Sequence, residues 1–260
     1  MTGSSIQNDI TRYWDQRAPL YHGYQQHPDR RDDDRRIWAE AFRAVLPEPP
    51  ARVLDLGTGS GFLAWVLADL GHQVTGTDLS PSMLRLARGH IPRPRHELGP
   101  PQGTRPTFEY GDAVRPDAAE CSIDVITSRY LLWTLCRPHE AISNWYRIVR
   151  PGGMLAMADA SWFPSGLEKN PTRGFAQHYH AAVRHGLPLA ETDTVAGAMR
   201  LMRDAGFLEV QARPLTTLHE IDRHREAVPG HEPQLQHLIT AVRPRSSSPE
   251  TERWLARVTS

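Results

Sequence analysis

Glycine residues gather where an early apolar run gives way to a helical pattern that starts at Phe62. Gly57, Gly59 and Gly61 would let the backbone approach a ligand closely, and the following helix would present free N–H groups to it. A dinucleotide-binding turn spaces its glycines as G-x-G-x-x-G, whereas the third glycine here comes one residue early. Asp55, two residues before the first glycine, would also repel a pyrophosphate. The turn therefore favours a ligand without phosphate.

Two more carboxylates stand where later apolar runs end. Asp78 follows Gly57 by 21 residues, which is where nucleotide-binding folds place a carboxylate on the ribose hydroxyls. Gly111 and Asp112 close the next run, and a carboxylate there can accept a hydrogen bond from the adenine amino group. Asp55 could serve a cationic ammonium group. Together these residues predict a pocket for an adenosine that carries an amino acid.

These segments resemble motifs of the class I S-adenosylmethionine-dependent methyltransferases. VLDLGTGSG (53–61), VTGTDLS (74–80), GDA (111–113) and RIVRPGG (147–153) match the family's motifs in order. The resemblance spans roughly residues 10–160 and, more loosely, 200–242. It implies S-adenosyl-L-methionine as the cofactor and S-adenosyl-L-homocysteine as the product. It implies cofactor contacts from Asp55, Gly57, Thr58, Gly59, Gly61, Asp78, Leu79, Met83, Gly111, Asp112, Ala113, Ser128 and Arg129.

The same resemblance gives these residues roles. The glycine turn would line the methionine and the ribose, with Asp55 behind the ammonium group. Leu79 and Met83 would pack on the adenine, whose edge would meet Asp112 and Ala113. The end of the fourth strand, Ser128 and Arg129, would lie near the methionine.

An aromatic segment near the start, YWDQRAPLY (13–21), resembles the one that opens many small-molecule members of that family. The resemblance implies that Tyr13 and Tyr21 close over the cofactor, and Trp14 is a candidate contact of the acceptor. The three-to-four spacing of these aromatic residues equally fits a helix that packs them on the core. Both interpretations stay open.

Candidate acceptor contacts follow the predicted fourth and fifth strands, because ligands of open parallel sheets lie beyond the carboxyl ends of the strands. Trp133 is one, unless it packs against the next helix, and Tyr179 is another. His178 or His180 could act as a general base, which methyl transfer needs only when the nucleophile must lose a proton. On one helix these two histidines would point apart, so no metal site is predicted.

The alternation of apolar runs and helical patterns predicts an α/β protein with a Rossmann-like fold, a mostly parallel seven-stranded sheet with helices on both faces and a helical cap. We expect strands at 52–56, 73–77, 107–110, 123–128, 154–159, from 206 onward and at 235–242. We expect helices at 62–70, at 81–88 with Ser80 as N-cap, and at 141–149. The charged block Asp29–Arg36 reads as a solvated helix start and 91–106 as a surface loop.

This pattern divides the chain into successive units. They are a helical cap over the cofactor (1–50), the cofactor-binding core (51–160), a helical cap insertion for the acceptor (161–205), C-terminal strands that complete the sheet (206–245) and a tail (246–260).

Composition narrows the classes of partner. Lys and Arg number 30 and Asp and Glu number 30, and this zero net charge argues against nucleic acid, which needs a basic surface. The longest uncharged run, Leu56–Ala68, is shorter than the roughly 20 apolar residues of a membrane span. No secretory signal is recognisable, and two cysteines are too few for a disulfide framework. We therefore expect a cytoplasmic monomer or homodimer that acts on a small molecule.

The sequence thus predicts methyl transfer from S-adenosylmethionine to an oxygen or nitrogen atom of a small molecule, in bacterial natural-product biosynthesis. One alternative is a C-methyltransferase. Another is a cofactor-binding accessory or pericyclase-like protein of the same fold that transfers no methyl group. A nicotinamide oxidoreductase is disfavoured by the glycine spacing and by Asp55.

Overall fold

The computed structural model describes residues 3–89, 104–170, 172, 174–224 and 233–245. The predicted tail and most of the predicted loop at 91–106 lie outside these residues. Seven strands form one sheet in the order β3-β2-β1-β4-β5-β7-β6, with β7 antiparallel to both of its neighbours and all other pairs parallel. The predicted Rossmann-like architecture is confirmed. The strands are β1 Arg52–Leu56, β2 Gln73–Asp78, β3 Thr107–Tyr110, β4 Ile123–Arg129, β5 Val149–Asp159, β6 Leu208–Pro214 and β7 His237–Val242.

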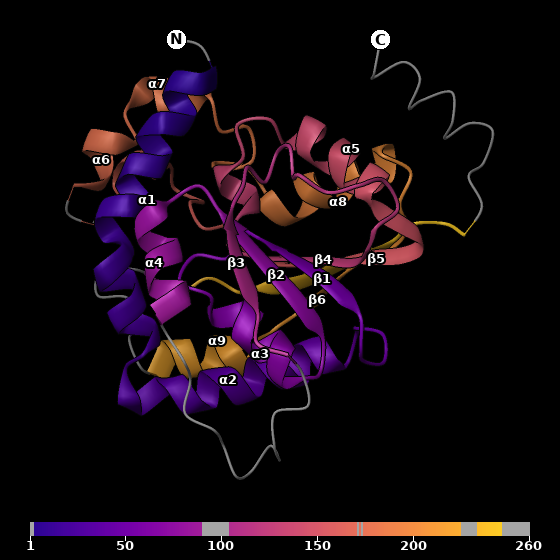
Figure 1. Cartoon of the computed structure of the whole chain (residues 1–260). Coiled ribbons are helices and arrows are strands. Elements are labelled where there is room, and N and C mark those ends of the chain that lie inside the picture. Colours follow the sequence, from indigo (N-terminus) through magenta and orange to yellow (C-terminus); the bar gives the residue numbers. More distant parts are fainter. Residues whose placement is uncertain (1–2, 90–103, 171, 173, 225–232, 246–260) are drawn as a thin grey trace.

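Helices cover both faces of this sheet (Figure 1). The lower layer in Figure 1 holds α2 (Pro28–Arg43), α3 (Phe62–Asp69) and α9 (Thr216–His224), and α4 (Pro81–Gly89) stands at the β3 side. The opposite face carries α5 (Pro138–Ile148) and α8 (Thr194–Asp204). A third group stands at one end of the sheet: α1 (Gly3–Gln25), α6 (Phe175–His178) and α7 (Ala181–His185).

The central strands are rich in apolar residues, as is typical of strands that are buried on both faces. Four successive residues of β1 are buried, and the last five of β5 are too. One apolar cluster joins the sheet to α5 and α8, and another joins it to α2, α3 and α4. The helix α8 belongs to this core, because Ala198 and Met202 pack in the first of these clusters. The helical cap predicted at 161–205 can therefore include only the residues before α8.

Several predicted boundaries shift. The strand β5 begins at Val149, because Gly152 and Gly153 continue the pairing through hydrogen bonds with Arg243. The helix α9 was not predicted at all. Ser80 caps α4 as predicted, since its hydroxyl accepts a hydrogen bond from the Met83 N–H group at 3.1 Å.

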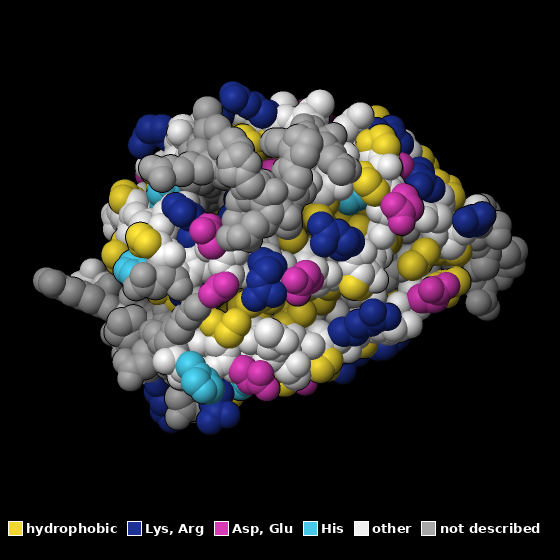
Figure 2. Space-filling model, turned by 90° about the horizontal axis from the view of Figure 1, so that it is seen from below, with side chains coloured by type: hydrophobic (Ala, Val, Ile, Leu, Met, Phe, Trp, Pro, Cys, Tyr) yellow, Lys and Arg dark blue, Asp and Glu magenta, His cyan; other side chains and the backbone are white. Residues whose placement is uncertain are grey.

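The charged block at the start of α2 is not simply solvated, and that prediction was wrong in part. Asp34 and Arg35 are buried. Arg30 pairs with Asp34 at 2.8 Å, and Arg35 pairs with Asp69 of α3. Figure 2 shows this side of the molecule, where basic and acidic side chains intermingle with small apolar patches. The block both faces solvent and fastens α2 to the core.

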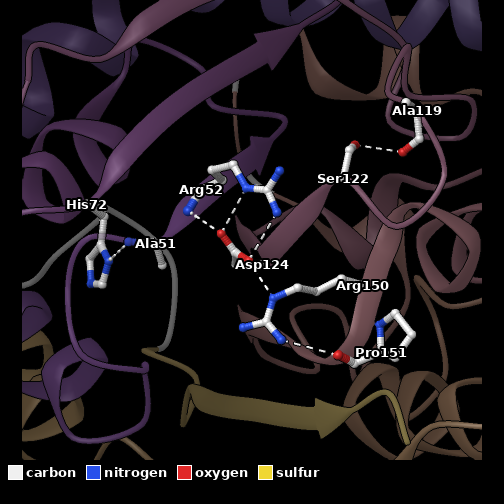
Figure 3. A network of polar contacts seen from close by, with 8 residues as sticks. All are labelled: Ala51, Arg52, His72, Ala119, Ser122, Asp124, Arg150 and Pro151. Atoms are coloured by element: carbon white, nitrogen blue, oxygen red, sulfur yellow. Dashed lines mark hydrogen bonds and ion pairs between the residues drawn. The ribbon is translucent and has the colours of Figure 1, made fainter. Parts of the chain in front are cut away.

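One carboxylate holds together the amino-terminal ends of central strands (Figure 3). Asp124 of β4 accepts hydrogen bonds from the Arg52 N–H group at 2.8 Å, from the Arg52 side chain, and from Arg150 of β5. Burial raises the pKa of Asp124, but these hydrogen bonds outweigh burial and hold the pKa well below its usual range. Asp124 therefore links the adjacent strands β1, β4 and β5 at the end of the sheet opposite the predicted site.

In the described part of the chain, the helices lack the length and apolar character that a membrane span requires. The two cysteines, Cys121 and Cys136, are both free thiols.

Candidate active site

The glycine turn lies at the carboxyl end of β1 and leads into α3. Gly57, Gly59 and Gly61 all have positive φ angles, of 61°, 56° and 83°. A Cβ atom on Gly57 would lie 2.8 Å from Leu131, and one on Gly61 would lie 2.7 Å from Phe108. A Cβ atom on Gly59 would have only distant neighbours, Tyr21 and Met83 at 3.9 Å. The turn is therefore packed at its two ends and open at Gly59.

Asp78 joins this turn to α4. Its two carboxylate oxygens accept hydrogen bonds from the Gly59 N–H group at 2.9 Å and the Ser80 N–H group at 2.8 Å. Burial raises the pKa of Asp78, and the N–H groups of Ser80, Gly59 and Leu79 oppose that rise. A carboxylate can accept about four hydrogen bonds, so Asp78 keeps acceptor capacity for a further donor. The structure thus places Asp78 directly at the open position of the turn.

Asp55 lies beneath the turn and is buried in the protein. Its oxygens accept hydrogen bonds from the Thr58 hydroxyl at 2.6 Å and the Thr127 hydroxyl at 2.9 Å. Burial raises the pKa of Asp55 to about 6, against the lowering effect of these hydroxyls. The side chain therefore holds the turn against β4, which agrees with an indirect role behind a ligand.

The residues predicted at an adenine edge lie beside Asp78. The Gly111 N–H group donates to the Asp78 carbonyl oxygen at 3.2 Å. Asp112 accepts a hydrogen bond from the Val114 N–H group at 2.8 Å, and the Ala113 carbonyl oxygen accepts one from the Trp145 indole at 2.7 Å. Leu79 is half-buried and Met83 is buried next to Gly59. These predicted residues do gather at one side of the turn.

The end of β4 holds a cation among aromatic rings. The Arg129 guanidinium lies 4.5 Å from the ring centroid of Tyr130, 4.7 Å from that of Phe62 and 5.6 Å from that of Trp38. It also donates to the Tyr21 hydroxyl at 3.5 Å. The hydroxyl of Ser128 is bonded to Met157, so only the backbone of Ser128 is left for the predicted role.

The helix α1 is fastened over the turn by contacts that the sequence analysis missed. Asp15 accepts hydrogen bonds at 2.8 Å from the Ser80 hydroxyl and from the Ser82 N–H group, at the first turn of α4. Gln25 accepts one from the Ser60 hydroxyl at 3.0 Å. Tyr21 lies between these two anchors. A usable signal was present, because Asp15 belongs to the aromatic segment already singled out.

Aromatic residues from α1, from the turn after β4 and from the segment after β5 meet in one cluster. Trp133 lies on the short 3-10 helix η2 (Leu132–Thr134) and is buried. Its ring contacts those of Trp14, Phe163 and Tyr179, with centroids 6.4, 4.9 and 5.6 Å away. Tyr13 contacts Trp14 and Tyr179 in edge-to-face fashion. The structure thus brings together all the predicted aromatic residues except Tyr21, which touches Trp14 from the turn side.

The two histidines do not behave as residues of one helix. The helix α6 ends at His178, and His180 begins α7 as its N-cap. His178 faces the Tyr13 ring, while His180 approaches the Asp9 carboxylate at 3.4 Å. Both therefore turn toward α1, contrary to the expectation that they point apart, because the chain breaks at Tyr179. In the described residues no group of three or more metal-ligating side chains is found.

A buried carboxylate at the end of β5 was missed. Asp159 accepts hydrogen bonds from the Leu132 and Ala160 N–H groups at 2.8 and 2.9 Å, and from the Trp162 indole at 2.6 Å. Burial raises the pKa of Asp159 to about 7, against the effect of these donors and of the Trp133 N–H group. It holds η2 at the sheet. Asp159 closes its strand as Asp78 does, so the same pattern could have identified it.

Comparisons with known families and proteins identify a methyltransferase domain in this chain. A family model described as "Methyltransferase domain" matches residues 54–157, from β1 to β5. The demethylmenaquinone methyltransferase of Deinococcus radiodurans is 32% identical over 146 residues, which are 55% of this chain and 57% of that protein. The ubiquinone/menaquinone biosynthesis C-methyltransferase UbiE of Roseobacter denitrificans is 27% identical over 70% of this chain and 76% of its own length. The chain thus spans only somewhat more than half the length of the first of these relatives.

Among solved structures, the [4+2]-cyclase SpnF superposes with a TM-score of 0.63 at 17% identity, over 91% of this chain and 96% of that protein. At this identity the likeness concerns the fold alone.

Proposed function

We propose that this chain acts as a class I S-adenosylmethionine-dependent methyltransferase, which binds S-adenosyl-L-methionine and transfers the methyl group to a small organic acceptor. The observation that carries the proposal is the open position at Gly59, between Tyr21 and Met83, with the Asp78 carboxylate bonded to the Gly59 N–H group. A ligand placed there would meet free backbone, a carboxylate and an aromatic ring together.

Each group around Gly59 suits one part of this cofactor. The remaining acceptor capacity of Asp78 suits a ribose hydroxyl. Met83 and Leu79 offer apolar surface to the adenine, next to Asp112. Arg129, with the Tyr21 hydroxyl, offers positive charge to the carboxylate of the methionine part. The bound cofactor supplies a methyl group already activated on sulfonium, so orientation by these residues is the main requirement.

The transferred methyl group is proposed to go to carbon in preference to oxygen or nitrogen. The name of the second relative above, a C-methyltransferase, supports this choice over our sequence-based expectation. The position of the histidines is compatible with it, because His180 is engaged by Asp9 and His178 lies against Tyr13. Methyl transfer to a hydroxyl group would profit more from a base within reach of the proton. A role in natural-product biosynthesis stays a prediction.

A second candidate function is a cyclase-like or accessory role without methyl transfer. It is the alternative that the sequence leaves open, and this fold accommodates both functions. Such a protein would retain the cofactor site and use the acceptor site to fold a reactive substrate.

The test begins with calorimetric titration of the protein with S-adenosylmethionine and with S-adenosylhomocysteine. We expect micromolar binding of both. Gly59→Val should abolish it by filling the open position, whereas Gly23→Val, on a glycine of α1 with no atom within 4 Å of its added Cβ, should leave it unchanged. A folded wild-type protein that binds neither ligand would refute the proposal.

Turnover then separates the two candidate functions. Cofactor with a carbon-13-labelled methyl group is incubated with acceptor candidates, and S-adenosylhomocysteine is detected by mass spectrometry. The chemical shift of the labelled methyl group in the product distinguishes attachment to carbon, nitrogen or oxygen. Cofactor binding together with substrate cyclisation and no labelled product would favour the cyclase-like role.

A further inference from the structure

Two regions of different chemical character border the open glycine turn, and α1, which stands at one end of the sheet (Figure 1), contributes residues to both. The first, here called the aromatic region, consists of Tyr13, Trp14, Trp133, Phe163, Phe175 and Tyr179. The second, here called the polar region, consists of Tyr21, Gln25, Ser60 and Arg129. Their different chemistry indicates which region suits the cofactor and which suits the acceptor.

The buried side chains around the aromatic region are apolar. Within α1 before Gln25, and within the described residues from 161 to 190, every buried side chain is hydrophobic. Phe175 and Tyr179 stack with ring centroids 4.2 Å apart, and Phe163 and Trp14 remain half-buried at the margin. A charged group moved into these surroundings would lose its hydration without gaining a partner.

The charged side chains at the margin of the aromatic region already have partners. Arg12 and His180 both approach the Asp9 carboxylate, at 3.2 and 3.4 Å. Arg184 pairs with Glu168. The Arg17 guanidinium lies 5.5 Å from the centre of the Tyr13 ring.

The buried carboxylate beside the aromatic region is likewise occupied. Asp159 accepts N–H groups from η2, from Ala160 and from the Trp162 indole. These donors come from the protein, so Asp159 is not placed as a counter-ion for a cationic acceptor.

The polar region, in contrast, contains charged and hydrogen-bonding side chains. The Arg129 guanidinium lies among Tyr130, Phe62 and Trp38 and reaches the Tyr21 hydroxyl. Behind it, the Tyr130 hydroxyl donates to Gln236 at 2.6 Å, and Gln236 donates to Asp222 at 3.0 Å. Arg30 stands between Asp222 and Asp34, at 3.6 and 2.8 Å. Charges of both signs are thus built into this side.

The two regions meet at the turn itself. Tyr21, next to Gly59, contacts the Trp14 ring at 5.6 Å, and Trp14 in turn contacts Trp133. Leu131, which precedes η2, packs on Gly57. A molecule in the aromatic region would therefore adjoin a ligand bound at Gly59.

We propose that the acceptor is an uncharged, apolar molecule with a ring system, held in the aromatic region. The argument rests on the proposed function, because a zwitterionic amino-acid group bound at Gly59 matches the polar region and leaves the aromatic region to the acceptor. Flat rings pack against the edges and faces of Trp133, Trp14 and Tyr179, which adds favourable contacts to the burial of apolar surface. Phosphorylated and ammonium-bearing acceptors are disfavoured.

The experiment compares three probes that share one ring system, on protein saturated with S-adenosylhomocysteine. They are 1-naphthol, which is neutral, 1-naphthyl phosphate, which is anionic, and protonated 1-naphthylmethylamine. Calorimetry should show that 1-naphthol binds about tenfold or more tightly than either charged probe, because the charged probes lose hydration. Tighter or equal binding of a charged probe, or no binding of 1-naphthol, overturns the proposal.

Matched variants locate the probe. Trp133→Phe should remove most of the quenching of tryptophan fluorescence by 1-naphthol, and Trp14→Ala, at the half-buried margin, should weaken its binding several-fold. Trp65→Phe, in α3 among core residues, should change neither. Quenching that survives Trp133→Phe and Trp14→Ala would place the probe elsewhere and refute the assignment.

Failure of the proposed function would appear differently. Titration with S-adenosylhomocysteine alone precedes the probes, and a folded protein that does not bind it contradicts the cofactor site. Normal binding of S-adenosylhomocysteine with no preference for the neutral probe contradicts only the assignment of the acceptor.

Discussion

At the scale of single residues, Asp78 has the most sharply defined expected role. Its carboxylate keeps acceptor capacity after bonding the Gly59, Ser80 and Leu79 N–H groups, and this capacity is expected to hold the ribose. Hydrogen bonds to a charged group contribute about 1.5–3 kcal/mol each. We therefore expect Asp78→Asn to weaken binding of S-adenosylhomocysteine by about ten- to a hundredfold, measured by calorimetry.

The same substitution also disturbs the turn, so the ribose role needs a second ligand. S-(2′-deoxyadenosyl)homocysteine lacks one of the hydroxyls that Asp78 would accept from. Wild-type protein should discriminate strongly between the two ligands, and Asp78→Asn should discriminate much less. Equal discrimination by both proteins would show that Asp78 only shapes the turn.

The sequence could predict contacts between residues that lie close together in the chain, but not contacts between distant segments. Gly57, Gly59 and Asp78 belong to one strand-turn-helix unit and the next strand, so their spacing alone indicated a site. Asp15 and Ser82 lie 67 positions apart, and their hydrogen bond arises only when α1 docks. Arg129 was placed near the methionine by resemblance, but its ring neighbours Trp38 and Phe62 come from two other elements.

At the scale of secondary-structure elements, α1 is held over the turn by Asp15 at α4 and by Gln25 at Ser60. Asp15→Ala removes a side chain that caps the first turn of α4, and the loss of such a cap costs about 1 kcal/mol. We expect faster hydrogen exchange at Ser82, Met83 and the facing part of α1, together with several-fold weaker binding of S-adenosylhomocysteine. Exchange followed by mass spectrometry checks the first effect.

The matched control lies on the same helix. Asp9→Ala removes a carboxylate that pairs with Arg12 and His180 and with no residue of α4 among those described. It should leave exchange at Ser82 and Met83 unchanged. Protection of α4 that is lost equally in both variants would mean that α1 loosens as a whole and that Asp15 has no particular anchoring role.

Elements with a strong repeating pattern were predicted well, and those shaped by long-range packing were not. The central strands β1 and β4 are short segments rich in buried apolar residues, so the local sequence indicates their positions. The break between α6 and α7 falls at Tyr179, whose ring is buried against Phe175 and Tyr13. No local signal marks that break, because tertiary packing decides it.

At the scale of the whole molecule, the two edges of the sheet have different tasks. The carboxyl edge carries the glycine turn, Asp78 and Asp159, where burial raises the pKa values of the two carboxyl groups. The amino edge carries Asp124, whose pKa is lowered. A buried carboxyl group with a raised pKa lowers the free energy of unfolding as the pH rises. The fold bears this loss of stability at the end of the sheet where ligands are expected.

Asp124 has the opposite linkage and gives a prediction for the stability of the entire fold. Its pKa is lower in the folded than in the unfolded chain, so its contribution is complete above the unfolded value and is lost as the pH falls through the folded value. Asp124→Asn should lower the free energy of unfolding by about 1.5–3 kcal/mol at neutral pH, and by progressively less below about pH 4. Urea denaturation at neutral and acidic pH measures both differences.

The comparison that decides this prediction is with an acid that makes no such network. Asp117 is exposed, so Asp117→Asn should change the free energy of unfolding little at either pH. Asp124→Asn should also leave binding of S-adenosylhomocysteine intact, because Asp124 pairs with Arg52 and Arg150 at the amino edge. A destabilisation of Asp124→Asn that is equal at both pH values would mean that lost packing, and not the ion pairs across β1, β4 and β5, accounts for its contribution.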